Sequence, residues 1–150
     1  MTAGEAIDVL REQCGVESHL EGGVVTMRVV ADQWQPAARV IRDRLGCRFF
    51  NWLTAIDWKE KGIEVLCRLE NLDDGVAVML RSQLPPGETH CPTLTGLYRG
   101  ADWMERECYD LLGVTFDGHP DLRRILLGED WEGHPLRKDY AVDMPFTPYR

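Results

Sequence analysis

Two glutamates separated by one residue, Glu105 and Glu107, form the first pair in this sequence whose chemistry could be catalytic. Paired carboxylates perform general acid–base catalysis when both face the same substrate atoms. On a helix, side chains two positions apart diverge by about 200°, so these two cannot share a substrate atom. We therefore favour a structural or interface role for both glutamates over catalysis.

Two histidines, His119 and His134, could bind zinc together with Cys108. A structural zinc site needs four ligands, and the sequence offers no evident fourth one. Each histidine lies in a Gly-His-Pro triplet, which is typical of a turn, so we expect both rings to make hydrogen bonds in turns. We therefore expect no metal site here.

The five cysteines are far apart and form no Cys-x-x-Cys pair. This spacing is typical of reduced thiols in a cytoplasmic protein and argues against a disulfide framework, a zinc ribbon or an iron–sulfur site. The chain also lacks a glycine-rich phosphate loop. We therefore expect the chain to bind no cofactor.

The two glutamates belong to a predicted helix at residues 103–112. Asp102 with Glu105 has the spacing of a capping box, and Gly113 is a typical helix stop. Four residues at helical spacing predict the buried face: Met104, Cys108, Leu111 and Leu112.

The polar residues of this helix are predicted to surround that buried face. Glu105 and Glu107 fall on opposite edges of the apolar stripe, so we expect both at its rim. Arg106 points away from the stripe, one turn from both Asp102 and Asp110. It forms either a solvated ladder with these two acids or a contact to a partner protein.

Upstream of this helix, the pattern predicts an α+β fold at residues 1–112. Capping boxes at Thr2/Glu5 and Asp32/Gln35 begin two helices, which end at Gly15 and Gly46. The predicted strands span residues 16–20, 24–30, 49–58, 63–70 and 76–81. Short connections favour a mostly antiparallel sheet of about five strands covered by helices, in the order αββαβββα. Residues 82–100, rich in Pro and Gly, are predicted to cross the sheet as a loop.

Two of the strands differ in how their residues alternate. Apolar and polar residues alternate in strand 63–70, which predicts one packed face and one wetter face that includes Glu64 and Arg68. Strand 49–58 is apolar on both faces. It lies either in the centre of the sheet or with one face free for a partner.

Residues 113–150, which we call the strap, show no amphipathic period. Their apolar content is too high for a free tail, so we expect an extended segment that docks on a partner surface. A Gly-His-Pro triplet occurs twice, each time followed by a leucine and two cations: Arg123 with Arg124, then Arg137 with Lys138. These cations form either a solvated basic face or contacts to an acidic, grooved partner. Trp131 is the best candidate for a buried interface anchor.

Composition narrows the function classes further. The chain has 150 residues, of which 44% are hydrophobic, and a net charge of −8. The length predicts a single packed domain, and the charge argues against non-specific binding of nucleic acid. No apolar run is long enough to cross a bilayer, and the N-terminus lacks the pattern of a signal peptide. We expect a soluble cytosolic chain that reaches a membrane only through partner subunits.

The helix and the strap together resemble a known family, the 30 kDa subunit (also called the C subunit) of proton-pumping NADH:quinone oxidoreductase, or respiratory complex I. The resemblance rests on Glu105, Arg106, Glu107, Asp110, Leu111, Leu112, His119, Arg123, Ile125 and Leu126, and on the segment 130–140 that ends at Tyr140. Many specified positions over about forty residues make this signal far more specific than a short motif.

The resemblance implies a non-catalytic subunit on the cytoplasmic side of the membrane, in the peripheral arm of the complex. FMN, iron–sulfur clusters and quinone would be bound in other subunits, while this chain braces the 49 kDa-type (D) subunit and the small cluster-bearing (B) subunit. The residues expected at partner interfaces are Glu105, Arg106, Glu107, Asp110, His119, Arg123, Arg124, Trp131, His134, Arg137, Lys138 and Tyr140.

Two alternatives stay open at this point. The chain could be the equivalent structural subunit of a membrane-bound [NiFe] hydrogenase or of a ferredoxin- or F420-dependent relative. It could also be a stand-alone enzyme that uses the Glu105/Glu107 region, although the divergence of these two side chains argues against that.

Overall fold

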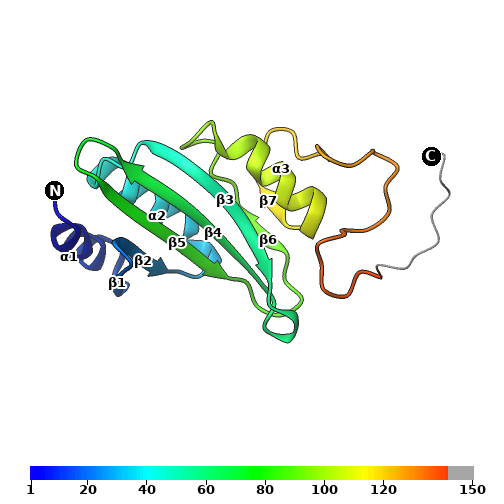
Figure 1. Cartoon of the computed structure of the whole chain (residues 1–150), viewed down its shortest axis with the longest axis horizontal. Coiled ribbons are helices and arrows are strands. Elements are labelled where there is room, and N and C mark those ends of the chain that lie inside the picture. The colour runs from blue at the N-terminus through cyan, green and yellow to red at the C-terminus, as the bar shows by residue number, and fades with distance from the viewer. Residues whose placement is uncertain (142–150) are drawn as a thin grey trace.

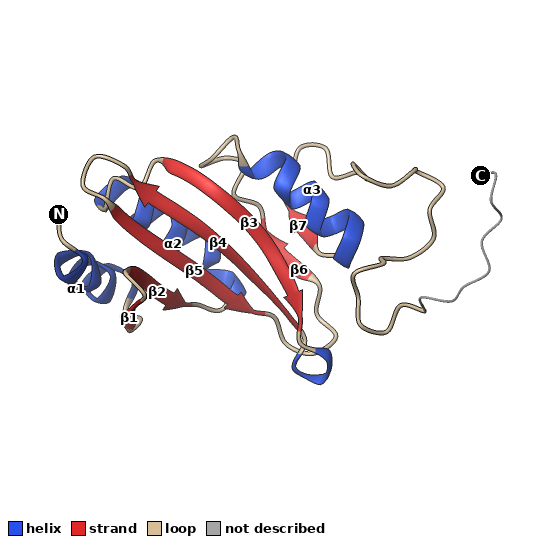
Figure 2. Ribbon diagram, in the orientation of Figure 1, coloured by secondary structure: helices blue, strands red, loops and turns tan. Residues whose placement is uncertain are grey.

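One five-stranded sheet forms the framework of the chain, and the computed structural model describes residues 1–141 (Figures 1 and 2). The elements are α1 (Ala3–Cys14), β1 (Ser18–Glu21), β2 (Val24–Arg28), α2 (Ala31–Arg44), β3 (Phe49–Asp57), η1 (Lys59–Lys61), β4 (Ile63–Asn71), β5 (Val76–Gln83), β6 (His90–Pro92), α3 (Ala101–Leu112) and β7 (Thr115–Asp117). The predicted α+β class and the order αββαβββα are confirmed, with three short elements added.

The sheet has the strand order β1-β2-β5-β4-β3. Three of its four pairings are antiparallel, and β2 runs parallel to β5. Helices α1 and α2 contact each other and pack on the same face of the sheet, where α2 lies behind the strands in Figure 1. The main core lies between these two layers, because the alternating apolar residues of the strands meet the apolar stripes of the helices.

The helix starts agree only in part with the predictions. The Thr2/Glu5 capping box of α1 is present, with both reciprocal hydrogen bonds. The box predicted for α2 is wrong, because Val30 is the N-cap and the Gln35 side chain instead donates to the carbonyl of Thr93 at 3.1 Å. A side chain that can cap locally can equally bind a distant backbone group once the fold brings one near.

Helix α3 begins earlier than predicted. Its first residue is Ala101 and its N-cap is Gly100, which makes no side-chain cap, so the Asp102/Glu105 capping box is also wrong. The predicted stop is confirmed, since Gly113 adopts a left-handed conformation with φ 73°.

The alternation predicted for β4 is correct on one face and wrong at two residues of the other, Glu64 and Leu66, which are both buried. The packed side is formed by Ile63, Val65, Cys67 and Leu69, which are all buried. Glu64, predicted on the wetter face, is only 1% exposed. Arg81 donates to both of its carboxylate oxygens at 2.8 and 2.9 Å, and Trp58 donates at 2.9 Å. Burial acts to raise the pKa of Glu64, but these donors outweigh it and hold the pKa below its ordinary value.

The strand that is apolar on both faces, β3, lies at the edge of the sheet and not at its centre. Its apolar character has a different cause, because α3 packs against it (Figure 1). Met104 of α3 accepts a hydrogen bond at its sulfur from the backbone N–H of Leu53, at 3.2 Å. The edge strand is therefore covered by the helix that carries the Glu-Arg-Glu triplet.

The loop that follows β5 supplies β6, which pairs in parallel with β7 of the strap to form a second, two-stranded sheet. This pairing joins the start of the strap to the domain, and Val114 and Phe116 are buried in the core. Residues 118–141 contain turns and loop but no helix or strand. The remainder of the strap, residues 142–150, for which docking on a partner was also predicted, lies outside the described residues.

The turn between β3 and β4 gives a first testable prediction. A Cβ on Gly62 would lie 2.7 Å from the carbonyl oxygen of Leu84, at a φ of +88°, whereas a Cβ on Gly75 would meet nothing within 4 Å at a φ of +69°. We expect Gly75→Ala to lower the free energy of unfolding by about 1–2 kcal/mol, because of backbone strain alone. Gly62→Ala should cost at least about 2 kcal/mol more, since backbone must also move. Urea unfolding of both variants checks this, and equal losses would contradict it.

Candidate functional site

A buried carboxylate on α3 forms the centre of the contacts between this helix and the strap. Asp110 is fully buried. Its Oδ1 accepts from Arg124 at 2.8 Å, and its Oδ2 accepts from three consecutive backbone N–H groups, those of Ile125, Leu126 and Leu127, at 3.2, 2.8 and 2.9 Å. Asp110 therefore fixes both the side chain and the backbone of the strap at residues 124–127.

This environment keeps Asp110 ionised. Burial acts to raise its pKa, but the hydrogen bonds from Arg124 and from the three backbone donors outweigh burial, so the pKa lies below its ordinary value. Hydrogen bonds to a charged group are among the stronger ones in proteins, and this carboxylate accepts four.

Arg124 connects this centre to the next turn of the strap. Its side chain is 14% exposed. Besides Asp110, it donates to the carbonyls of Trp131 and Gly133, both at 2.9 Å. The planar guanidinium group has five N–H donors in a fixed arrangement, which suits it to hold several acceptors at once. One arginine therefore joins α3 to two separate parts of the strap.

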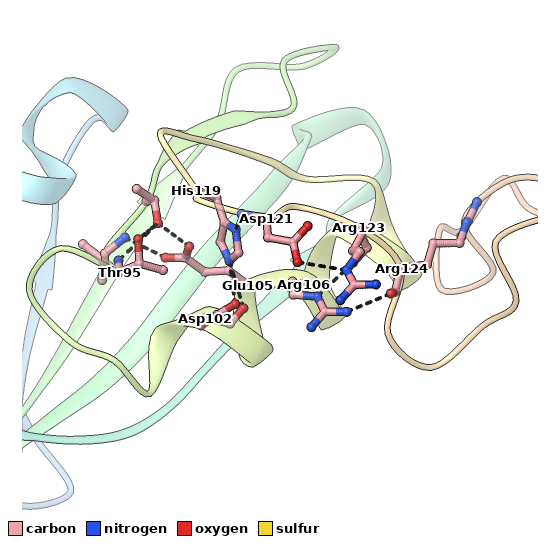
Figure 3. A network of polar contacts seen from close by, with 10 residues as sticks. Thr95, Asp102, Glu105, Arg106, His119, Asp121, Arg123 and Arg124 are labelled. Atoms are coloured by element: carbon pink, nitrogen blue, oxygen red, sulfur yellow. Dashed lines mark hydrogen bonds and ion pairs between the residues drawn. The ribbon is translucent and has the colours of Figure 1, made fainter.

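Arg106 holds the strap from the neighbouring face of the helix (Figure 3). It donates to the carbonyls of Arg123 and Arg124, at 3.2 and 3.0 Å. The predicted ladder from Arg106 to Asp102 and Asp110 is therefore wrong. The reason is that Asp110 points inward to the strap, while Asp102 lies against His119.

The turn hydrogen bond predicted for the ring of His119 is confirmed, whereas the one predicted for the ring of His134 is wrong, because that ring binds the end of α3 instead. The ring of His119 is buried; its Nε2 lies 3.1 Å from the carbonyl oxygen of Asp102, and its Nδ1 accepts from the backbone N–H of Asp121 at 3.0 Å. This pattern assigns the proton to Nε2. His134 binds the carbonyl oxygen of Asp110 through Nδ1 at 3.0 Å, and its ring meets Tyr109 edge-on.

The end of α3 is capped by Arg137, the first cation of the second basic pair. Arg137 donates through Nε to the carbonyl of Leu112 at 2.6 Å, and the backbone N–H of Leu136 donates to Leu111 at 2.9 Å. A cation at this position satisfies the unpaired carbonyls of the last helical turn and faces the negative end of the helix. Arg106, Asp110, Arg124, His134 and Arg137 together form what we call the α3–strap junction.

A last contact fixes the strap to the sheet. The carboxylate of Asp57, at the end of β3, accepts from the backbone N–H of Lys138 at 2.9 Å and from that of Lys59 at 2.8 Å. Sequence reasoning missed Asp57, whose only signal was its place at the end of a strand.

Glu105 faces the other way from the junction and is fully buried, so its predicted place at the rim is wrong (Figure 3). It accepts from the hydroxyl of Thr93 at 2.5 Å and from the backbone N–H of Leu94 at 2.7 Å. The loop before α3 covers this face, which the helical pattern alone could not reveal. Burial raises the pKa of Glu105 to about 7, although both hydrogen bonds act in the opposite direction.

The other candidate residues lie outside the α3–strap junction. The side chains of Glu107 and Lys138 are exposed, and the side chain of Arg123 pairs with Asp121 on the surface, so these three side chains do not join the junction. The ring of Tyr140 lies close against Gly133. A Cβ added to Gly133 would lie 3.0 Å from the Tyr140 ring. Direct contact of any of the predicted interface residues with a partner stays a prediction.

The chain brings no metal-ligand cluster together within residues 1–141, where no group of three His, Cys, Asp or Glu side chains is placed to hold an ion. The five cysteines are free thiols. Burial raises the pKa of the Cys47 thiol to about 12, and burial also raises the pKa of Cys67, Cys91 and Cys108. Neutral buried thiols of this kind pack as small apolar side chains.

The sequence matches one family model over residues 27–145, described as "Respiratory-chain NADH dehydrogenase, 30 Kd subunit". The C subunit of NADH-quinone oxidoreductase from Chlorobium phaeobacteroides is 40% identical over 147 residues, which cover 91% of this chain and 87% of that protein. The C subunit from Salinispora arenicola is 35% identical over 82% of this chain. The match covers 52% of that protein, so this chain spans about half of its length. A fused C/D subunit from Aeromonas salmonicida is 54% identical over 80 residues, 53% of this chain and 13% of the fusion.

Solved structures share the fold. A chain of an archaeal membrane-bound sulfane sulfur reductase superposes with a TM-score of 0.81 at 26% identity, covering 93% of this chain and 86% of that one. A trypsin-resistant fragment of Nqo5 superposes with a TM-score of 0.67 at 23% identity, covering 81% of this chain and all of the fragment.

Proposed function

The chain belongs to the 30 kDa subunit family of the respiratory-chain NADH dehydrogenase, and from this premise we propose that it works in NADH-quinone oxidoreductase as a non-catalytic subunit that braces its neighbours through the strap. The NADH-quinone oxidoreductase complex is a multi-subunit enzyme, so the chain contributes to an enzyme. In the proposal, FMN, the iron–sulfur clusters and quinone are bound by other subunits.

The bracing role is supported by the contacts of the junction's polar side chains, which are made within the chain and hold the strap on α3. The side chains of Asp110, Arg124 and His134 form hydrogen bonds between α3 and the strap, and Glu105 is enclosed by the loop that precedes α3. The junction thereby holds an otherwise irregular segment at a fixed place, and ordering a segment before binding lowers the entropic cost of association.

Two leucines of the ordered strap supply the contact surface. Leu126 is 62% exposed and Leu136 is 55% exposed, although the backbone of each is fixed to α3. Large apolar side chains on rigid backbone are typical of interface anchors. We infer that these two leucines are buried against a neighbouring subunit.

The partner favoured by the relatives is the 49 kDa-type D subunit. Several relatives are named as joint C/D subunits, and fusion of two chains keeps them together after synthesis. The small cluster-bearing B subunit is the second proposed partner, on the resemblance alone. No helix within residues 1–141 has the length and apolarity to cross a membrane, and we propose association with the cytoplasmic face of the membrane through these partners.

The rival role is that of an equivalent subunit in a hydrogenase-type or ferredoxin- or F420-dependent complex. The archaeal sulfane sulfur reductase chain shares the fold, at 26% identity. The relatives that cover most of this chain at 36–40% identity are C subunits of NADH-quinone oxidoreductase, which favours the first role.

The proposal is tested by affinity purification of the tagged chain from membranes in mild detergent. We expect the native chain to recover the D and B subunits, together with NADH:quinone reductase activity. Leu126→Glu with Leu136→Glu should lower this recovery at least about tenfold, because two charges would be buried without partners. Leu72→Glu is the matched control, since Leu72 is 65% exposed and lies in the β4–β5 turn, away from the strap.

Each outcome of this purification bears on the proposal. Recovery of the native chain as a lone monomer would contradict the proposal that it is a subunit of the complex. Full recovery of the double variant would remove the proposed role of the two leucines, provided that its thermal midpoint equals that of the control.

A further inference from the structure

A hollow of about 350 Å³ lies away from the strap, between the start of β3 and the turn that precedes α3. Three arginines, Arg42, Arg48 and Arg99, line it together with the rings of Phe49 and Phe50. None of the strap residues 113–141 belongs to its lining. The two elements that form it lie beside each other in Figure 1, on the side of α3 where the helix begins.

The positive charge of this hollow is mostly unpaired. Arg42 pairs with Asp43 at 3.1 Å, but the side chains of Arg48 and Arg99 form no ion pair or hydrogen bond within residues 1–141. The chain as a whole carries a charge of −8, so a hollow lined by three guanidinium ions has the opposite sign to the net charge of the chain. Such a local reversal of charge attracts anionic groups.

Contacts within the chain hold the aromatic wall of the hollow in place. The hydroxyl of Tyr98 donates to the carbonyl of Cys47 at 2.7 Å, and the Tyr98 ring meets that of Phe50 at 5.4 Å. A Cβ at Gly100 would lie 3.3 Å from the Phe50 ring, so the backbone approaches this ring closely. A site that is formed before binding loses little conformational entropy when it is occupied.

We propose that this hollow binds an acidic segment of a partner subunit, with carboxylates on Arg48 and Arg99 and an apolar side chain on Phe49. Guanidinium groups match carboxylates in a bidentate geometry. The positive end of the α3 dipole, at Gly100, adds to the attraction. The inference rests on the proposed assembly and adds a second contact, remote from the strap.

The aromatic part of the hollow favours a peptide over other anions. Phe49 is 46% exposed beside Leu97, which offers apolar area that a free phosphate ion cannot use. An anionic lipid surface attracts broad basic faces, whereas here three cations lie in a hollow on an acidic chain. A segment with two or more acids near an apolar side chain complements both parts.

The test uses the assembled complex. Phe49 is replaced by the photoreactive analogue p-benzoylphenylalanine, the purified complex is irradiated, and the cross-linked peptide is identified by mass spectrometry. We expect one segment of another subunit, with at least two Asp or Glu close to the cross-linked residue. Arg48→Gln with Arg99→Gln should lower the cross-link yield about tenfold, because two charge-assisted contacts are lost.

The matched control is Arg39→Gln, which removes one charge from an exposed residue of α2 that does not line the hollow. Its yield should equal that of the native chain. Cross-links to lipid, to a neutral or basic segment, or to nothing would overturn the inference, as would a yield that does not depend on the two arginines.

A second experiment distinguishes binding of a peptide from binding of free phosphate. Inorganic phosphate should lower the yield no more than chloride of the same ionic strength, and a specific effect of phosphate would overturn the inference. If the complex assembles but the cross-link is absent, only this inference falls. If the chain does not purify with the complex, the proposed function falls as well.

Discussion

Replacing Arg124 with methionine is expected to lower the free energy of unfolding by about 3–5 kcal/mol, because it leaves Asp110 as a buried charge without its cation. Asp110 is fully buried, and the side chain of Arg124 is only 14% exposed. The methionine keeps most of the apolar stem, so the loss reflects the charge and the hydrogen bonds to Trp131 and Gly133. Urea unfolding at neutral pH measures it.

The neighbouring arginine supplies the control for this experiment. Arg123 carries the same charge one residue earlier, but its side chain is 61% exposed and pairs with an equally exposed Asp121. Arg123→Met should change the free energy of unfolding by no more than about 0.5–1 kcal/mol. Similar losses for the two variants would contradict the assignment of Arg124 as the residue that holds the strap.

The same variant should release the strap to proteases. With Arg124 gone, the links to Trp131 and Gly133 are lost, so we expect cleavage between residues 125 and 137 under conditions in which the native chain resists.

Acid should also loosen the strap of the native chain. Because the pKa of Asp110 is lowered by folding, its contribution is present above its unfolded pKa and is lost as the pH falls through the folded pKa.

Glu105 is expected to have the opposite dependence on pH. Its pKa rises from the ordinary 4.5 to about 7 in the folded chain, because burial disfavours the charge. The folded chain therefore holds this proton more tightly than the unfolded chain does. The contribution of the protonated group is complete below about pH 4.5 and is lost as the pH rises through about 7.

Glu105→Gln should remove this dependence, because the amide is neutral and can still accept from Leu94 and donate to Thr93. Since one pKa unit corresponds to about 1.4 kcal/mol, we expect the variant to be about 1–3 kcal/mol more stable than the native chain at pH 8. At pH 5 the two should agree within about 1 kcal/mol. Urea unfolding at both values measures the difference.

The control is Glu107→Gln, on the exposed side of the same helix. Its effect should be within about 0.5 kcal/mol at both values. If Glu105→Gln destabilised the chain at pH 8 as much as at pH 5, the buried carboxyl would not titrate as described.

Local patterns predicted most of the fold. The Thr2/Glu5 box and the stops at Gly15 and Gly113 depend on residues a few positions apart and are present, and the alternation predicted for β4 holds on its packed face. The capping boxes at Asp32 and Asp102 failed because each relevant side chain finds a partner from a distant segment. Spacing cannot reveal such a partner before the tertiary structure is known.

The candidate site was predicted in its residues but not in its contacts. The family resemblance selected Arg106, Asp110 and His119; the first two bind the strap from α3, and His119 binds α3 from the strap. Helical periodicity placed Glu105 at the rim, whereas the Pro-rich loop encloses it. A loop without a period gives no signal of which helix face it covers, so this burial could be seen only in the structure.

The α3–strap junction holds Leu126 and Leu136 outward, and in the proposed assembly a neighbouring subunit covers both. Hydroxyl-radical footprinting tests this most directly, because it reports the solvent access of single side chains in the free chain and in the purified complex. We predict that oxidation of both leucines falls several-fold on assembly, while that of Leu72, which is similarly exposed in the free chain, stays unchanged. Equal oxidation of Leu126 and Leu136 in the free and assembled states would contradict the bracing role of the strap.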